Sequence, residues 1–420
     1  MEKAKISDKL YVLGRREKTG GGALNIGRYY ALDGSLGSHV YIDALKPHVV
    51  LICGKRGYGK SYTMGTFIEE IASLEEEARK NIGVVVIDTL GIFWTLSQPN
   101  KRQEDLIKKW GMDAKNFGIK VFSSEENVNE YRNKGIEAEK LLIRTSELSQ
   151  HHWAQLFNLA TTDYVAAAIG RAVNRAREEK KDFDIDDIIE SLEKDDRLRE
   201  EIKVVAENLL YMAKEWKIFD KNGTSIYDIV RGGRITILDI SPFAEELKVV
   251  IVAIISRKIF EERVKERRKY EEMLIEGSSE RKEEIPITWL AIDEAHVFLP
   301  EEECLTKEVL IKQWMRQGRQ PGVALILATQ RPSSLDAEVL SHSDIIICHR
   351  LTAQEDIDAL NKVRPTYMQG EIGDAIKRIG TEKGVALILD DTSEAVHIIK
   401  IRPRLSWHGG EEPSAMIKND

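Results

Sequence analysis

The sequence predicts an α/β fold, in which a mostly parallel sheet carries helices on both faces. From His48 onward, short apolar runs alternate with segments of helical periodicity, which is typical of strands joined by helical crossovers. Three runs at 49–52, 83–88 and 287–292 are apolar enough to predict buried strands. A last pair of runs, 385–401, surrounds a short polar turn and predicts a C-terminal β-hairpin.

Composition limits the classes of protein to which the chain can belong. Its 420 residues suffice for one large α/β domain with an insertion or for two domains, and 31% of them are charged. The formal net charge of −8 means that any contact with nucleic acid must use a local basic track. The three cysteines are scattered, the N-terminus has no apolar signal core, and the longest apolar runs are too short to span a bilayer. We therefore expect a cytoplasmic protein without membrane contact.

Shifts in composition predict the domain boundaries. Between about 147 and 228, long helical periodicities and many charges replace the apolar runs, which predicts a helical insertion of four helices with a solvated charged face. The charged stretch 263–284 predicts a helix end followed by an exposed loop. The expected parts are a short N-terminal leader at 1–45 with brief strands near 11–13 and 40–42, a core at 46–403 that contains the insertion, and a tail at 404–420.

The strongest motif follows the first buried strand. The residues GKRGYGKS at 54–61 fit the phosphate-loop pattern G-x-x-x-x-G-K-[ST], and a helical pattern comes next. Glycines let the backbone wrap a polyphosphate, and the helix N-terminus adds positive potential. A chance match in a glycine-containing turn is disfavoured by this strand and helix context. The predicted ATP-binding residues are Gly54, Gly57, Gly59, Lys60, Ser61 and Tyr62; Lys60 would reach the β- and γ-phosphates, and the Ser61 hydroxyl would ligate Mg²⁺.

An acid pair closes the strand at 287–292. We expect Asp293 to hold Mg²⁺ through water and Glu294 to polarise the attacking water as general base. An adjacent glutamate is typical of ATPases that drive motion and is generally absent from GTPases and small-molecule kinases. Asp88 ends another strand at the same edge, where it either helps to orient the magnesium shell or caps the chain. His296 follows the pair and is expected to be a supporting or packing residue.

A third strand, 323–329, ends in Gln330. We expect it to lie between the strand of the phosphate loop and that of the acid pair, so that Gln330 contacts the γ-phosphate and the lytic water. The alternative is a plain amide at a strand end.

Two arginines flank Gly318 just before that strand. Arg319, or else Arg316, is predicted to be an arginine finger that reaches the ATP of a neighbouring subunit. Alternatively, both offset the dipole of a helix C-terminus. Adjacent His151 and His152 show no metal-site spacing.

These residues resemble the HerA/FtsK group of P-loop ATPases, and HerA-like archaeal and bacterial members most closely. The resemblance rests on GKRGYGKS at 54–61, VVVID at 84–88, ITILDIS at 235–241, WLAIDEAH at 289–296, GRQPGVALILATQRPSSLD at 318–336 and the closing hairpin. It implies a RecA-like core in a hexameric ring that hydrolyses ATP to translocate or unwind double-stranded DNA, with a partner nuclease in repair or defence. Two departures are the short leader, where HerA proteins usually begin with a β-barrel, and Ile92, where the family tends to have an acid.

Other functions remain open at this point. A related ATPase of the conjugation or secretion type would move DNA or protein, and a nucleotide-gated scaffold would regulate a nuclease with negligible turnover. A two-lobed DEAH helicase is disfavoured because the chain shows no second RecA-like lobe. For a DNA pore, the candidate basic residues are Lys55, Arg56, Arg263 and the cluster 267–269.

Overall fold

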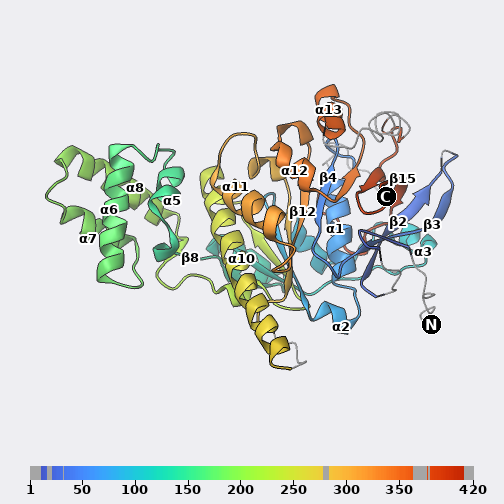
Figure 1. Cartoon of the computed structure of the whole chain (residues 1–420), viewed down its shortest axis with the longest axis horizontal. Coiled ribbons are helices and arrows are strands. Elements are labelled where there is room, and N and C mark those ends of the chain that lie inside the picture. Colours follow the sequence, from blue (N-terminus) through green and yellow to red (C-terminus); the bar gives the residue numbers. More distant parts are fainter. Residues whose placement is uncertain are drawn as a thin grey trace.

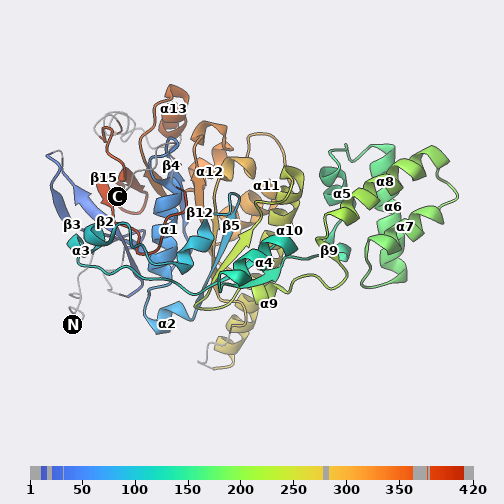
Figure 2. The same ribbon diagram turned by 180° about the vertical axis from the view of Figure 1, so that it is seen from behind.

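One large sheet runs through the molecule (Figures 1 and 2). The structure, a computed structural model, describes residues 11–16, 21–31, 33–277, 283–362, 376 and 379–410. Within them the sheet has 13 strands in the order β1-β3-β2-β15-β14-β13-β4-β12-β11-β5-β10-β6-β7. The strands are β1 (Val12–Leu13), β2 (Ala23–Tyr30), β3 (Leu36–Asp43), β4 (Val49–Cys53), β5 (Ile82–Asp88), β6 (Ile119–Ser123), β7 (Glu137–Lys140), β10 (Ile235–Asp239), β11 (Ile287–Ile292), β12 (Val323–Thr329), β13 (Ile345–Cys348), β14 (Val385–Asp390) and β15 (Ala395–Ile401).

The centre of this sheet is parallel. Every neighbouring pair from β13 to β7 is parallel, whereas β14 and β15 form the predicted antiparallel hairpin. Strand β12 pairs with β4 on one side and β11 on the other, as predicted from the residues at the strand ends. Because parallel strands end at the same edge, the phosphate loop, the acid pair and Gln330 meet there. The predicted α/β, RecA-like fold class is confirmed.

Helices cover both faces of the sheet, and alternate strand residues face each layer. In β5, Val84 and Val86 join the core under α1 (Lys60–Ile71), while Val85 and Ile87 join the core under α10 (Glu245–Ile275). The other helices are α2 (Glu76–Arg79), α3 (Glu104–Lys109), α4 (Glu125–Asn133), α5 (Gln150–Leu156), α6 (Tyr164–Glu179), α7 (Ile185–Glu193), α8 (Glu200–Glu215), α9 (Ile226–Ile229), α11 (Leu305–Val309), α12 (Ala337–His342) and α13 (Gln354–Lys362). No helix in the described ranges is long and apolar enough to cross a membrane.

Helices α5 to α8 lie to one side of the sheet (Figure 1), within the stretch assigned to an insertion. The two short strands β8 (Ile143–Arg144) and β9 (Phe219–Asp220) pair where the chain enters and leaves this group. Trp153 is fully buried there and stacks on Phe157, because the helices enclose an aromatic cluster of their own.

The N-terminal strands are longer than predicted. The sequence predicted brief strands near 11–13 and 40–42, but β2 and β3 are eight residues each and extend the main sheet through β15. Strand β2 was missed, although its alternation buries Leu24 and Ile26. Pairing with β15, far away in the sequence, stabilises this strand, and a local pattern does not reveal such a partner.

The predicted end of helix α10 was also too early in the chain. It continues to Ile275, and its second half extends past the sheet (Figure 1). Arg263 does not face a pore. Its buried guanidinium donates to the carbonyl oxygens of Pro321 and Ile285 and pairs with Glu283 at 3.1 Å. The predicted exposed loop lies partly outside the described residues.

The first residues of the predicted tail pack firmly on α1. Arg404, Leu405 and Ser406 are buried, and the backbone N–H groups of Leu405 and Ser406 donate to the Glu69 carboxylate. The structure thus places 404–406 in the core, which corrects the prediction of a separate tail at these positions. Residues 411–420 lie outside the described part.

Candidate nucleotide-binding site

The phosphate loop joins β4 to α1 with a backbone that requires glycine. Gly54 has a φ of 151°, and a Cβ there would come within 2.6 Å of the Cβ atom of His349. Helix α1 begins at Lys60 without a side-chain N-cap, so its first backbone N–H groups are available to an anion. The loop and helix therefore form a cradle for phosphate.

Lys60 lies at the mouth of this cradle. Its ammonium group is 3.4 Å from the carbonyl oxygen of Lys55, within its own loop. Burial lowers the pKa of Lys60, although the nearby carboxylates of Glu294 and Asp293 oppose that shift. The electrostatic attraction between a cation and a phosphate is stronger in a partly desolvated site than in bulk water.

Ser61 and Asp293 lie side by side across the sheet edge. The Ser61 hydroxyl donates to Asp293 Oδ2 at 2.9 Å. Burial, reinforced by the charge of Glu294, raises the pKa of Asp293 to about 6. A hydroxyl and a carboxylate in contact are the oxygen donors that Mg²⁺ accepts beside phosphate and water. In the described residues there is no group of three or more His, Cys, Asp or Glu that could hold a metal without phosphate.

Glu294 and Gln330 meet at the ends of β11 and β12. Gln330 Nε2 donates to Glu294 Oε1 at 2.5 Å, and His296 Nδ1 lies 3.5 Å from Glu294 Oε2. Glu294 has a φ of 51°, a left-handed conformation that is uncommon for a residue with a side chain and recurs at active sites. The structure thus brings the predicted base and the predicted sensor amide into contact.

Asp88 has a different environment from the one predicted for a metal ligand. Both of its carboxylate oxygens face backbone, accepting from the N–H groups of Phe93 at 2.7 Å and Leu90 at 3.3 Å. Burial, together with the charges of Asp239 and Asp293, raises its pKa to about 7. These contacts favour the capping role that the sequence left as the alternative.

The two candidate fingers differ in their contacts. Arg316 pairs with Glu338 through Nη2, at 2.6 Å. Arg319 is exposed and makes no hydrogen bond or ion pair with any residue in the described ranges. An unengaged guanidinium on the surface is free to reach a second molecule, so the geometry favours Arg319 over Arg316.

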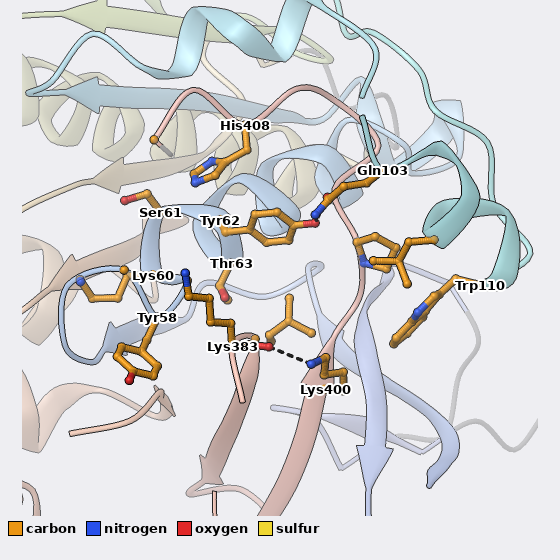
Figure 3. Close-up of a pocket in the computed structure, with 17 residues that line it drawn as sticks. Tyr58, Lys60, Ser61, Tyr62, Thr63, Gln103, Trp110, Lys383, Lys400 and His408 are labelled. Carbon is orange, nitrogen blue, oxygen red and sulfur yellow. Dashed lines mark hydrogen bonds between the residues drawn. The ribbon is translucent and has the colours of Figure 1, made fainter. Parts of the chain in front are cut away.

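A cavity of about 610 Å³ opens directly from the phosphate loop (Figure 3). Its walls come from three segments that are distant in the sequence: the loop and α1, helix α3 with Trp110, and the C-terminal stretch from 383 to 410. Sequence reasoning found the first wall only. Gln103, Leu106, Trp110 and His408 carry no local motif, because their proximity to Lys60 depends on the folded chain.

Comparison with known proteins adds to this geometry. Residues 24–259 match the family model "Helicase HerA, central domain". The chain belongs to this HerA family. The "DNA double-strand break repair helicase HerA" of Pyrococcus furiosus is 27% identical over 187 residues, which cover 41% of this chain and 33% of that protein. The protein of the same description from Sulfurisphaera tokodaii is 20% identical over 94% of this chain and 72% of its own length.

A solved structure shows the same fold. VirB4 of Thermoanaerobacter pseudethanolicus aligns with a TM-score of 0.55 at 14% identity, covering 93% of this HerA-family chain and 98% of the VirB4 chain. The resemblance to HerA that the strand-end motifs predicted is confirmed by the match to the HerA family model. The chain spans only about a third of the length of the Pyrococcus relative.

Proposed function

We propose that this HerA-family chain is an ATP-hydrolysing motor that assembles into a ring and translocates or unwinds double-stranded DNA. We propose further that it works with a partner nuclease. The observation that carries the ATPase part is the contact between Ser61 and Asp293 at 2.9 Å, beside Lys60 and Glu294. It unites the phosphate loop with the acid pair, which are more than 200 positions apart.

The site residues would divide the chemistry of hydrolysis among them. The loop N–H groups and Lys60 would hold the β- and γ-phosphates, and Ser61 and Asp293 would hold Mg²⁺, which neutralises phosphate charge when bound. Glu294 would take a proton from the attacking water, with Gln330 keeping its carboxylate oriented. His296 would support the same carboxylate from its other oxygen.

Oligomerisation is proposed from the exposed arginine. Arg319 makes no hydrogen bond or ion pair within the described chain, and a guanidinium supplied by a neighbouring subunit would stabilise charge that develops on the γ-phosphate. A ring, which we propose to be hexameric, gives every subunit such a neighbour.

DNA is proposed as the moved polymer because several relatives are described as DNA double-strand break repair helicases. The net charge of −8 requires a local basic track, and Lys55 and Arg56 are exposed on the phosphate loop. Other candidates fit less well, because Arg263 is buried and Arg267 and Lys269 pair with glutamates on their own helix.

The decisive experiment measures the ATPase rate with and without duplex DNA, on material of measured oligomeric mass. We expect turnover by an oligomer, stimulation by duplex DNA, and loss of that stimulation as salt rises, because phosphate contacts release counterions. Turnover that ignores DNA would contradict the DNA part alone. A monomer with full turnover would contradict the ring.

A further inference from the structure

The cavity beside the phosphate loop extends well beyond the space that a triphosphate needs. Its volume of about 610 Å³ lies within the range of roughly 300–1,000 Å³ that is usual for small-molecule sites. Figure 3 shows Lys60 and Trp110 at opposite sides of it, with Tyr62 and Gln103 between them. A ligand anchored by phosphate at Lys60 would therefore direct its other end toward Trp110.

We propose that helix α3, Trp110 and His408 form the subsite for the purine base of a nucleoside triphosphate. The proposal rests on the proposed binding of nucleotide at the phosphate loop and specifies which base is accepted. It assigns a role to residues that none of the sequence motifs includes.

The apolar part of this subsite comes from α3. Leu106 is 43% exposed although it is apolar, and it lines the cavity together with Trp110. The guanidinium of Arg28 lies over the Trp110 ring, 6.0 Å from its centre, and so holds one side of the indole. The side that faces the cavity offers a flat surface on which a base can stack.

The polar part is a single oriented amide. Gln103 Oε1 accepts from the Tyr62 hydroxyl at 2.8 Å and from Asn100 Nδ2 at 3.0 Å. The Tyr62 oxygen itself accepts from the backbone N–H of Arg404, so its proton must point to Gln103. This arrangement leaves the Gln103 NH₂ group as a donor without a partner in the described chain. Ring nitrogens N3 and N7 occur in adenine and guanine alike, so we expect the subsite to accept both purines.

His408 closes the cavity from the C-terminal segment. Its ring packs edge-on against Tyr62, with 5.2 Å between ring centres, and Arg404 Nη1 lies 3.5 Å from its Nδ1. Burial, together with the charge of Arg404, lowers the pKa of His408 to about 4, so the ring is neutral at physiological pH. The neutral ring adds a further planar wall without adding charge beside the base.

The test compares Trp110→Ala with the wild-type chain by isothermal titration with Mg²⁺ and ATP, GTP, CTP or inorganic tripolyphosphate. We expect the wild type to bind both purine triphosphates about tenfold more tightly than CTP, since stacking strengthens with ring area. Trp110→Ala should lose about tenfold in affinity for ATP and GTP, lose the purine preference, and bind tripolyphosphate as the wild type does. Trp110→Phe should retain most of the preference.

The matched control is Trp407→Ala, because Trp407 is 38% exposed and lines a separate hollow near Trp94. It should leave all four affinities unchanged. Trp110→Ala protein that still prefers purines by the wild-type factor would overturn the base subsite. Wild-type protein that binds neither ATP nor tripolyphosphate would instead overturn the proposed nucleotide binding itself.

Discussion

At the scale of single residues, Glu294 concentrates the chemistry of the site. Its backbone is left-handed at a φ of 51°, and its carboxylate touches Gln330 through one oxygen. A strained conformation persists only where the surroundings impose it. Here the neighbouring Asp293 contributes, because its Oδ1 accepts from the Glu294 N–H at 2.9 Å. The backbone thus aims the proposed base toward the phosphate loop.

The first prediction concerns that base. Glu294→Gln should bind ATP with wild-type affinity but lower kcat at least about 100-fold, because an amide cannot accept the proton of the attacking water. Glu302→Gln, at an exposed position on the following loop, should retain wild-type turnover. Steady-state rates and titration with ATP measure both effects. Normal hydrolysis by the Glu294 variant would refute its assignment as base.

The second prediction concerns the phosphate ligand. Lys60→Ala should abolish measurable binding of ATP, because the loop loses its buried cation. Lys55→Ala changes an exposed lysine of the same loop and should bind ATP as the wild type does. Equal loss in the two variants would mean that general loop charge, not Lys60, holds the phosphates.

The third prediction concerns pH and stability. His48 is buried between Asp344 and Asp43; burial favours its neutral form, but hydrogen bonds to both carboxylates outweigh burial and raise its pKa to about 9. The protonated His48 ring stabilises the folded state fully below the pKa of His48 in the unfolded chain, which is near 6.5. This stabilisation is lost as pH rises through the folded-state pKa of about 9. The wild type should thus lose roughly 3 kcal/mol more than His48→Gln between pH 6.5 and 10 in urea unfolding. His151→Gln, at an exposed site, should follow the wild type.

At the scale of secondary-structure elements, the helix of the phosphate loop is joined to the C-terminal segment through Glu69. This carboxylate is fully buried and accepts from Arg402 Nη1 at 2.9 Å and from Arg404 Nε at 3.1 Å. The two arginines keep the pKa of Glu69 below its usual value in spite of burial. The same segment carries His408 to the cavity, so the network couples α1 to the proposed base subsite.

The fourth prediction tests this coupling. Glu69→Gln should destabilise the protein by about 3–5 kcal/mol in urea unfolding, because two buried guanidinium groups lose a charged partner. Glu77→Gln, on the exposed surface of α2, should change stability by less than about 0.5 kcal/mol. A Glu69 variant as stable as the wild type would show that Glu70, which also pairs with Arg402, suffices.

At the scale of the whole molecule, we propose that a neighbouring subunit completes the site through the exposed Arg319. The fifth prediction is that Arg319→Ala alone is inactive but regains part of its ATPase activity when mixed with Lys60→Ala subunits. Each partner then supplies the group that the other lacks. Arg316→Ala should remain active alone, because Arg316 is already paired with Glu338. Absence of any rescue in mixed oligomers would argue against a finger that acts between subunits.

The central strands, the phosphate loop and the acid pair were predictable from the amino-acid sequence alone. Each is a short stretch whose function depends on residues next to one another, so a local pattern suffices to identify it. The order β4, β12, β11 was also predicted, because the strand that ends in Gln330 was expected to lie between the strand of the phosphate loop and that of the acid pair.

Other features depend on segments that are distant in the sequence and come together only in the folded chain. Strand β2 depends on pairing with β15. The buried Arg263 guanidinium donates to carbonyl oxygens from other segments. The cavity is lined both by α3 and by residues between 383 and 410. A local pattern does not identify the partner in any of these contacts, because the partner residues lie far away in the sequence. The walls of the cavity therefore depend on the fold, whereas the phosphate-loop motif consists of eight consecutive residues, 54–61.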